Sequence, residues 1–96
     1  MEKMRENVSV AADFLKGLSH KSRLLILCKL VEGEHNVSQL IEFTGLAQSS
    51  MSQHLKKLKD EDIIDYRRDH RTLYYYIKDP SVLRIMGVLH DVFCKK

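Results

Sequence analysis

Residues 46–58 show the clearest alternation of hydrophobic and polar positions in the chain. Met51, Leu55 and Leu58 follow one another at intervals of four and three residues, which places them on one side of a helix. The opposite side carries hydroxyl, amide, imidazole and ammonium groups and no carboxylate, on Gln48, Ser49, Ser50, Ser52, Gln53, His54, Lys56 and Lys57. The pattern predicts a helix that packs through one side and offers the other to a polar partner.

Two helices are predicted in the first third of the chain. Apolar spacing indicates an amphipathic helix over about 7–18 and a second one over 20–32. Ser19 can cap the second helix, and Gly33 can end it. Apolar residues widen the face of this second helix on both sides, so we expect it to be the most buried helix.

A short helix is predicted directly before the polar-faced one. After a polar link in which Val37 can form a brief strand, Ser38 can cap a helix that closes at Gly45. A helix, a tight turn containing glycine and a second helix form a helix-turn-helix, here over about 38–60, whose second helix typically enters the major groove of DNA. The polar face described above therefore predicts contacts with base edges and phosphates. A solvated face on an ordinary amphipathic helix is the alternative.

A β-hairpin is predicted next, because 64–68 and 72–77 are rich in β-branched and aromatic residues and flank the turn region 69–71. As a whole this wing covers about 63–77. Cationic side chains gather around its turn, on Arg67, Arg68, His70 and Arg71. We expect them to reach phosphates or an adjacent minor groove. The alternative is a charged edge that deters aggregation of the sheet.

The last predicted element is a helix over about 80–94. Asp79 supplies its cap, and Pro80 takes the first helical position, where proline fits well. The apolar face of this helix is broad, which indicates a dimer interface at the end of a chain whose 96 residues provide only a small core. The fold class is therefore predicted to be mainly α with a small β-hairpin, in a single domain over 1–96.

Composition and charge narrow the class of protein. Lys and Arg number 16 against 13 Asp and Glu, and the resulting charge of +3 permits a polyanionic ligand without requiring one. The opening MEKMREN has no apolar region of a signal peptide, and the longest apolar run, 24–28, is too short to cross a bilayer. We expect a cytoplasmic protein with no membrane partner. Cys28 and Cys94 form no CxxC, which argues against a zinc finger, and both are expected to be thiols in a reducing compartment.

Over essentially the whole chain, the order of predicted elements resembles the ArsR/SmtB family of winged-helix repressors. The family's second-helix signature is similar to SHKSRLLIL, its recognition-helix segment to LAQSSMSQHLKKLKDEDII, and its wing to YRRDHRTLYYYI. The resemblance implies a homodimer, built by the terminal helices, whose paired recognition helices read an inverted-repeat operator in double-stranded DNA. Ala47 departs from the family pattern, which usually has a capping serine there, so the helix start is expected at Gln48 or Ser49.

The resemblance also bears on the signal that such a repressor senses. Residues 35–38 lack the cysteine of the family's thiolate-rich metal site, and two of four ligands expected for a zinc site on the terminal helix are missing, so we expect no metal and no cofactor. Cys28 in ILC and Cys94 in VFC resemble the BigR/SqrR/HlyU subgroup, whose equivalent cysteines sense reactive sulfur species or oxidants by joining within a subunit. A persulfide on one cysteine can be attacked by the other thiol. An inert, buried Cys28 is the alternative.

These features predict a dimeric, sequence-specific transcriptional repressor that responds to reactive sulfur species or oxidants through Cys28 and Cys94. The alternatives are a metal-responsive repressor of the same fold, a thiol enzyme and a winged-helix protein-interaction module. No catalytic residue, substrate pocket or cofactor motif can be identified from the sequence, so an enzyme is not expected. A protein-interaction module predicts no salt-sensitive DNA binding, whereas a repressor requires it.

Overall fold

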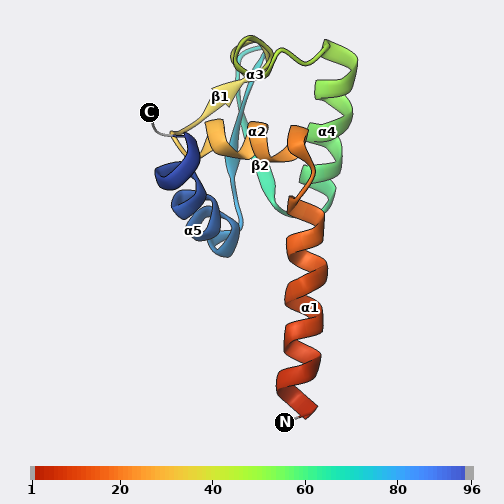
Figure 1. Ribbon diagram of the computed structural model, residues 1–96. Coiled ribbons are helices and arrows are strands. Elements are labelled where there is room, and N and C mark those ends of the chain that lie inside the picture. The colour runs from red at the N-terminus through yellow and green to blue at the C-terminus, as the bar shows by residue number, and fades with distance from the viewer. Residues whose placement is uncertain (1, 95–96) are drawn as a thin grey trace.

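The computed structural model describes residues 2–94 as a winged helix-turn-helix, and the predicted fold class is confirmed (Figure 1). Its elements are α1 (Glu2–Leu18), α2 (Lys21–Leu30), β1 (His35–Asn36), α3 (Val37–Thr44), α4 (Gln48–Asp60), β2 (Ile64–Asp69), β3 (Thr72–Ile77), α5 (Pro80–Leu89) and the π-helical turn η1 (His90–Cys94). Figure 1 shows α1 extending away from the body that the other elements form, with α4 and α5 flanking α2.

The core lies where α2, α4 and α5 meet the sheet. Ile26 and Leu27 of α2, Met51 and Leu58 of α4, and Val82 of α5 expose no surface to solvent. Each such apolar side chain contributes roughly 1.5–3 kcal/mol to folding through burial. More buried residues come from α2 than from any other helix in the described part of the chain, which confirms the expectation for this helix.

The hairpin forms as predicted, with β2 and β3 antiparallel and joined by a tight turn. The register ends at Asp69↔Thr72, so Asp69, expected in the turn, is the last residue of β2. His70 follows with a φ of 58°, a left-handed conformation that suits a two-residue hairpin turn and that histidine adopts more readily than most residues. The turn therefore forms without the glycine that it would ordinarily contain.

A third strand widens the wing into a sheet of order β1-β3-β2. In this strand, β1, His35 pairs with Tyr75 and Asn36 with Tyr74. Val37 was expected in a brief strand at this point, but it is already the first residue of α3. The strand pairing ties the start of the helix-turn-helix directly to the centre of the wing.

The start and the end of α2 both differ from the prediction. Its N-cap is His20, whose Nδ1 accepts the Ser22 N–H at 3.2 Å. Ser19, the expected cap, instead donates its hydroxyl to the Lys16 carbonyl oxygen at 2.8 Å. The helix ends at Leu30 rather than at 32, because the N–H groups of Glu32 and Gly33 bond to carbonyls only three residues back.

The cap of α3 lies two residues before the predicted one. Asn36 Oδ1 accepts the Gln39 N–H, and Gln39 Oε1 accepts the Asn36 N–H, each at 2.9 Å. This reciprocal capping box satisfies two backbone donors at once. The Ser38 side chain, the expected cap, is exposed within the first turn of the helix.

We expect Asn36→Ala to lower the free energy of unfolding by about 1 kcal/mol, because it leaves the Gln39 N–H without its acceptor. Urea denaturation followed by circular dichroism measures the change. Ser38→Ala is the matched control, since it removes a polar side chain from the same turn without touching the capping box. An equal loss of stability in both variants would contradict the assignment of the cap.

Large apolar side chains are exposed on the two outer helices. They are Met4, Val8, Val10 and Leu15 on α1, and Leu83, Val88, Val92 and Phe93 on α5 and η1. The start of α1 at Glu2 corrects the expected start near 7, and the added residues 2–5 are all good helix formers. Among residues 2–94, no helix combines the length and the apolar character needed to span a membrane.

Candidate nucleic-acid interface

A sharp turn after α3 sets the direction of α4. Gly45 has a φ of 73°, which glycine adopts without strain, and its N–H bonds to the Ile41 carbonyl oxygen at 2.8 Å. This confirms the predicted closure of the short helix. Ala47 occupies the N-cap position of α4 without a side-chain hydrogen bond, and the helix begins at Gln48, one of its two expected starts.

The two sides of α4 separate as the hydrophobic pattern predicts. Met51, Leu55 and Leu58 are buried and attach the helix to the core. The candidate contact residues occupy the accessible surface, with Ser50 and His54 partly buried and the others exposed: Gln48, Ser49, Ser52, Gln53, Lys56 and Lys57. The structure therefore brings all the sequence-predicted residues of this helix onto one accessible face.

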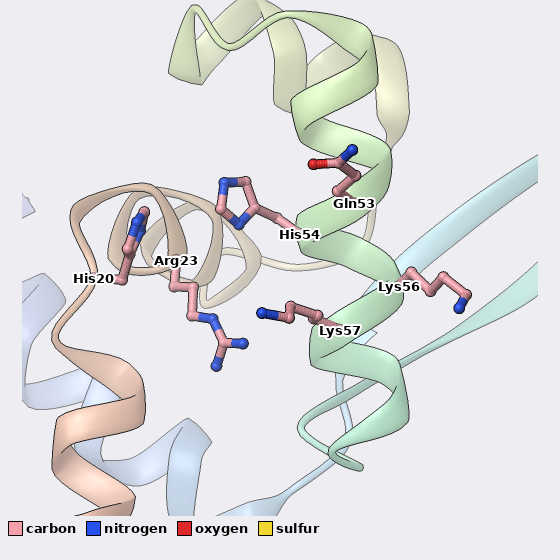
Figure 2. Close-up of a pocket in the computed structure, with 6 residues that line it drawn as sticks. All are labelled: His20, Arg23, Gln53, His54, Lys56 and Lys57. Carbon is pink, nitrogen blue, oxygen red and sulfur yellow. The ribbon is translucent and has the colours of Figure 1, made fainter.

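A cleft of about 380 Å³ opens between α4 and the start of α2 (Figure 2). Six residues line it: His20, Arg23, Gln53, His54, Lys56 and Lys57. The centroids of the His20 and His54 rings are 5.3 Å apart. Figure 2 shows Arg23 and Lys57 extending toward each other across the gap, whereas Lys56 points away from it. The lining offers nitrogen groups of two helices to an anion.

One of the cations beside this cleft is already paired. Arg23 holds the Glu61 carboxylate through two hydrogen bonds, of 2.7 and 3.2 Å, and also donates to the Gly17 carbonyl oxygen. The hydrogen bond from Arg23 lowers the pKa of Glu61 below its usual range. Burial lowers the pKa of the His54 imidazole below its usual 6.5, and the charges of His20, Arg23 and Lys57 lower it further.

Sequence reasoning missed His20 and Arg23 as members of this surface. Both lie at the start of α2, and no periodicity links them to α4, which begins 25 residues after Arg23. The position of His20 between a predicted cap and an apolar helix signals only a helix start. Their place beside His54 follows from the way α2 and α4 pack in the folded chain.

The wing presents its cations in two different settings. Arg68 and Arg71 are exposed at the turn, and within residues 2–94 neither has an ion-pair partner. His70 lies between them in sequence, and its Nδ1 is 2.7 Å from the Asp69 carboxylate. These side chains are available to a ligand that approaches the tip of the hairpin.

The exposed side chain of Arg67 is already paired with other residues of the protein. Its Nε donates to both carboxylate oxygens of Glu34, at 2.8 and 2.9 Å, and its guanidinium lies 4.6 Å from the centre of the Tyr74 ring. The Glu34 hydrogen bond raises the pKa of Arg67 further above its usual value. This setting differs from the open position expected for Arg67 beside the turn, and it links β2 to the segment before β1.

Cys28 is buried on α2, which packs against α5. It is disulfide-bonded in this structure. Cys94 is the last residue of η1, and its side chain lies outside the described residues, so its pairing with Cys28 stays a prediction.

A polar contact joins the start of η1 to the segment after α2. His90 Nε2 is 3.0 Å from Glu32 Oε2, and this hydrogen bond lowers the pKa of Glu32.

Comparison with known proteins gives consistent matches over the whole fold. The family model described as bacterial regulatory protein, arsR family, matches residues 20–66. The nodulation protein NolR of Rhizobium meliloti is 42% identical over 92% of this chain and 72% of its own length. The crystal structure of the transcriptional repressor BigR from Xylella fastidiosa superposes with a TM-score of 0.90 at 33% identity, covering 99% of this chain and 96% of that one. Reduced HlyU from Vibrio cholerae gives a TM-score of 0.88 at 30% identity, covering 99% and 100%.

Proposed function

The chain belongs to the arsR family of bacterial regulatory proteins, and from this premise we propose that it is a homodimeric transcriptional repressor that binds an inverted-repeat operator and is released by reactive sulfur species or oxidants. Membership of the family makes it a winged helix-turn-helix regulator of transcription. The mode of DNA contact, the dimer and the signal are the parts that we propose.

The observation that carries the proposal is the accessible face of α4. Its hydroxyl and amide groups match the donors and acceptors of base edges in a major groove, into which an α-helix fits. We assign base recognition to Gln48, Ser49, Ser52 and Gln53. The exposed cations Lys57 on α4 and Arg68 and Arg71 on the wing suit phosphates, which fix the register of a protein on DNA.

The homodimer is supported by the exposed apolar surface of α1 and α5. The long helix α1 extends from the body in Figure 1, and helices in proteins take most of their stability from packing of an amphipathic face. A second copy that covers these faces would stabilise α1 and place two α4 helices in successive major grooves.

The proposed signal acts on the contact between α2 and the end of the chain. Cys28 lies on α2, and Cys94 ends the turn that continues α5. A bridge between their sulfur atoms would fix α2 against the terminal helix, which is also the proposed dimer contact. A shift of that helix changes the spacing of the two α4 helices and favours a conformation that binds the operator poorly.

Truncation of a side chain on α4 and of one on the wing is expected to cause different defects in DNA binding. Gln53→Ala should weaken binding to the preferred sequence by roughly 1–3 kcal/mol and relax base choice, because it removes a bidentate amide. Arg68→Ala should weaken specific and non-specific binding alike. It should also reduce the slope of log affinity against log salt concentration by about 1, the contribution of one phosphate contact. Fluorescence anisotropy measures both, with a duplex that the protein selects from a random library and a scrambled duplex, each at several salt concentrations.

Ser38→Ala serves as the control for that experiment, because its hydroxyl is exposed on α3 and takes no part in the capping box. It should bind both duplexes as the unmodified protein does. Binding of the unmodified protein that is equally tight for any duplex and independent of salt would overturn the proposed function. A Gln53→Ala defect that is the same on both duplexes would overturn the assignment of α4 to base recognition.

A further inference from the structure

The cleft between α2 and α4 differs from the rest of the accessible α4 face, because side chains from the start of α2 line one side of the cleft. Its lining contains two imidazoles, an amide and three cationic side chains, and no carboxylate. The nearest acid in contact with the lining is Glu61, and both its carboxylate oxygens are occupied by Arg23. Lys56 is 4.0 Å from Asp60 and points away in Figure 2. Lys57 is thus the cation left open toward the cleft.

The two histidines are in different hydrogen-bonding states. His20 Nδ1 accepts the Ser22 N–H as the cap of α2, so in the neutral ring the proton is on Nε2, which remains a donor. His54 has no hydrogen-bond partner among residues 2–94, and its only ring contact is with His20. Protonation of His20 would disrupt the cap, whereas His54 can accept a proton without losing any bond.

We propose that this cleft binds a backbone phosphate of the operator, with Lys57 and His20 as donors, and that His54 takes up a proton when the phosphate enters. The proposal rests on the proposed function, since it needs DNA on the α4 surface, and it adds His20 and a proton to the interface. When a helix occupies the major groove, the sugar-phosphate backbone of the DNA runs alongside it. A phosphate would therefore lie beside α4.

The charges around His54 set the direction of the effect. In the free protein, burial and the neighbouring His20, Arg23 and Lys57 disfavour the charged form of His54 and lower its pKa. A phosphate adds negative charge and favours the charged form, which raises the pKa of His54 in the complex. Protons therefore bind with DNA, and affinity is full below the free-state pKa and falls as pH rises through the complex-state pKa.

The test measures operator affinity against pH at constant ionic strength, using reduced protein and a labelled duplex that the protein selects from a random library. The unmodified protein should lose affinity as the pH rises from about 5 to about 8, by roughly tenfold if the phosphate raises the pKa of His54 by about one unit. His54→Gln should bind weakly with a flat profile. His54→Lys, which carries its charge throughout this range, should bind tightly with a flat profile.

A direct measurement follows the same proton. The imidazole resonance of His54, titrated by nuclear magnetic resonance, should show a higher pKa with the duplex bound than without it. His35→Gln is the matched control, because His35 lies in β1, bonds to the Gly33 carbonyl oxygen and has no place in the cleft. It should keep the affinity and the pH profile of the unmodified protein.

The outcomes separate this proposal from the function on which it rests. If the unmodified protein binds the duplex with salt sensitivity but His54→Gln keeps its pH profile, the cleft does not take up the proton and the inference is wrong. If the pH dependence of affinity is lost in His70→Gln and kept in His54→Gln, the proton binds at the wing, and the inference is also wrong. Absence of salt-sensitive binding by the unmodified protein at every pH would overturn both.

Discussion

Serine in place of either cysteine is expected to abolish the release of operator DNA by polysulfide, while the reduced variants bind DNA as tightly as the unmodified protein. The physical reason is that a persulfide on one cysteine becomes a bridge only when the other thiolate attacks it and expels hydrogen sulfide. Cys28→Ser and Cys94→Ser each remove one of the two reactants. Operator anisotropy before and after polysulfide, and then after a thiol reductant, measures the response.

Intact-mass spectra identify the product in the unmodified protein. Loss of two hydrogens indicates a simple disulfide, whereas a gain of one or two sulfur atoms beyond it indicates a longer bridge and favours sulfane sulfur as the signal. Cys28 is buried among apolar side chains, so Cys28→Ala is included as a variant that places no hydroxyl in the core. A single-cysteine variant that still forms an intrasubunit bridge, or is still released by polysulfide, would rule out the two-cysteine switch.

The second large effect is expected from a charge on the exposed apolar side of α1. Met4, Val8 and Leu15 recur at helical spacing on that side, and the Val8 side chain is 60% exposed in the single chain. Val8→Glu would bury an unpaired carboxylate in the proposed dimer contact. We expect a monomer, and a loss of operator affinity of roughly a hundredfold or more, because two linked half-sites then bind independently.

Val10→Glu is the matched control for the dimer. Val10 is 69% exposed on the same helix but lies on a different side of it from Val8. This variant should remain dimeric and keep most of its affinity. Sedimentation velocity gives the oligomeric state, and anisotropy gives the affinity. A dimeric Val8→Glu protein with unchanged operator binding would show that α1 does not form the contact.

Local signals were enough to predict most elements of this fold. Met51, Leu55 and Leu58 share a helical side at any position in space, so their spacing alone identified the buried face of α4. Gly45 and the pair Asp79-Pro80 predicted a helix end and a helix start, because backbone conformation and capping depend on a few neighbouring residues. The polar face of α4 followed directly, since it is the remainder of the same periodic pattern.

Cap choice marks the point at which local signals became insufficient. Ser38 and Asn36 are both good capping residues, and the sequence offers each of them near the start of α3. The structure selects Asn36, whose pairing in β1 with Tyr74 of β3 fixes where the extended backbone ends. The Asn36 cap therefore depends on a strand 38 residues away, which the pattern around it does not contain.

The sequence by itself determined the helix-turn-helix, the wing and the polar face of α4, because each depends on spacing within one element or on one turn. Only the tertiary structure decided which cations are open to a ligand. Arg67 and Arg68 are adjacent and alike in sequence, yet Arg67 is bound by Glu34 and stacked on Tyr74. His20 likewise joins His54 only because α2 packs beside α4. Ion pairs and clefts form between residues that are close in space but far apart in sequence. The packing of the core determines which residues come close.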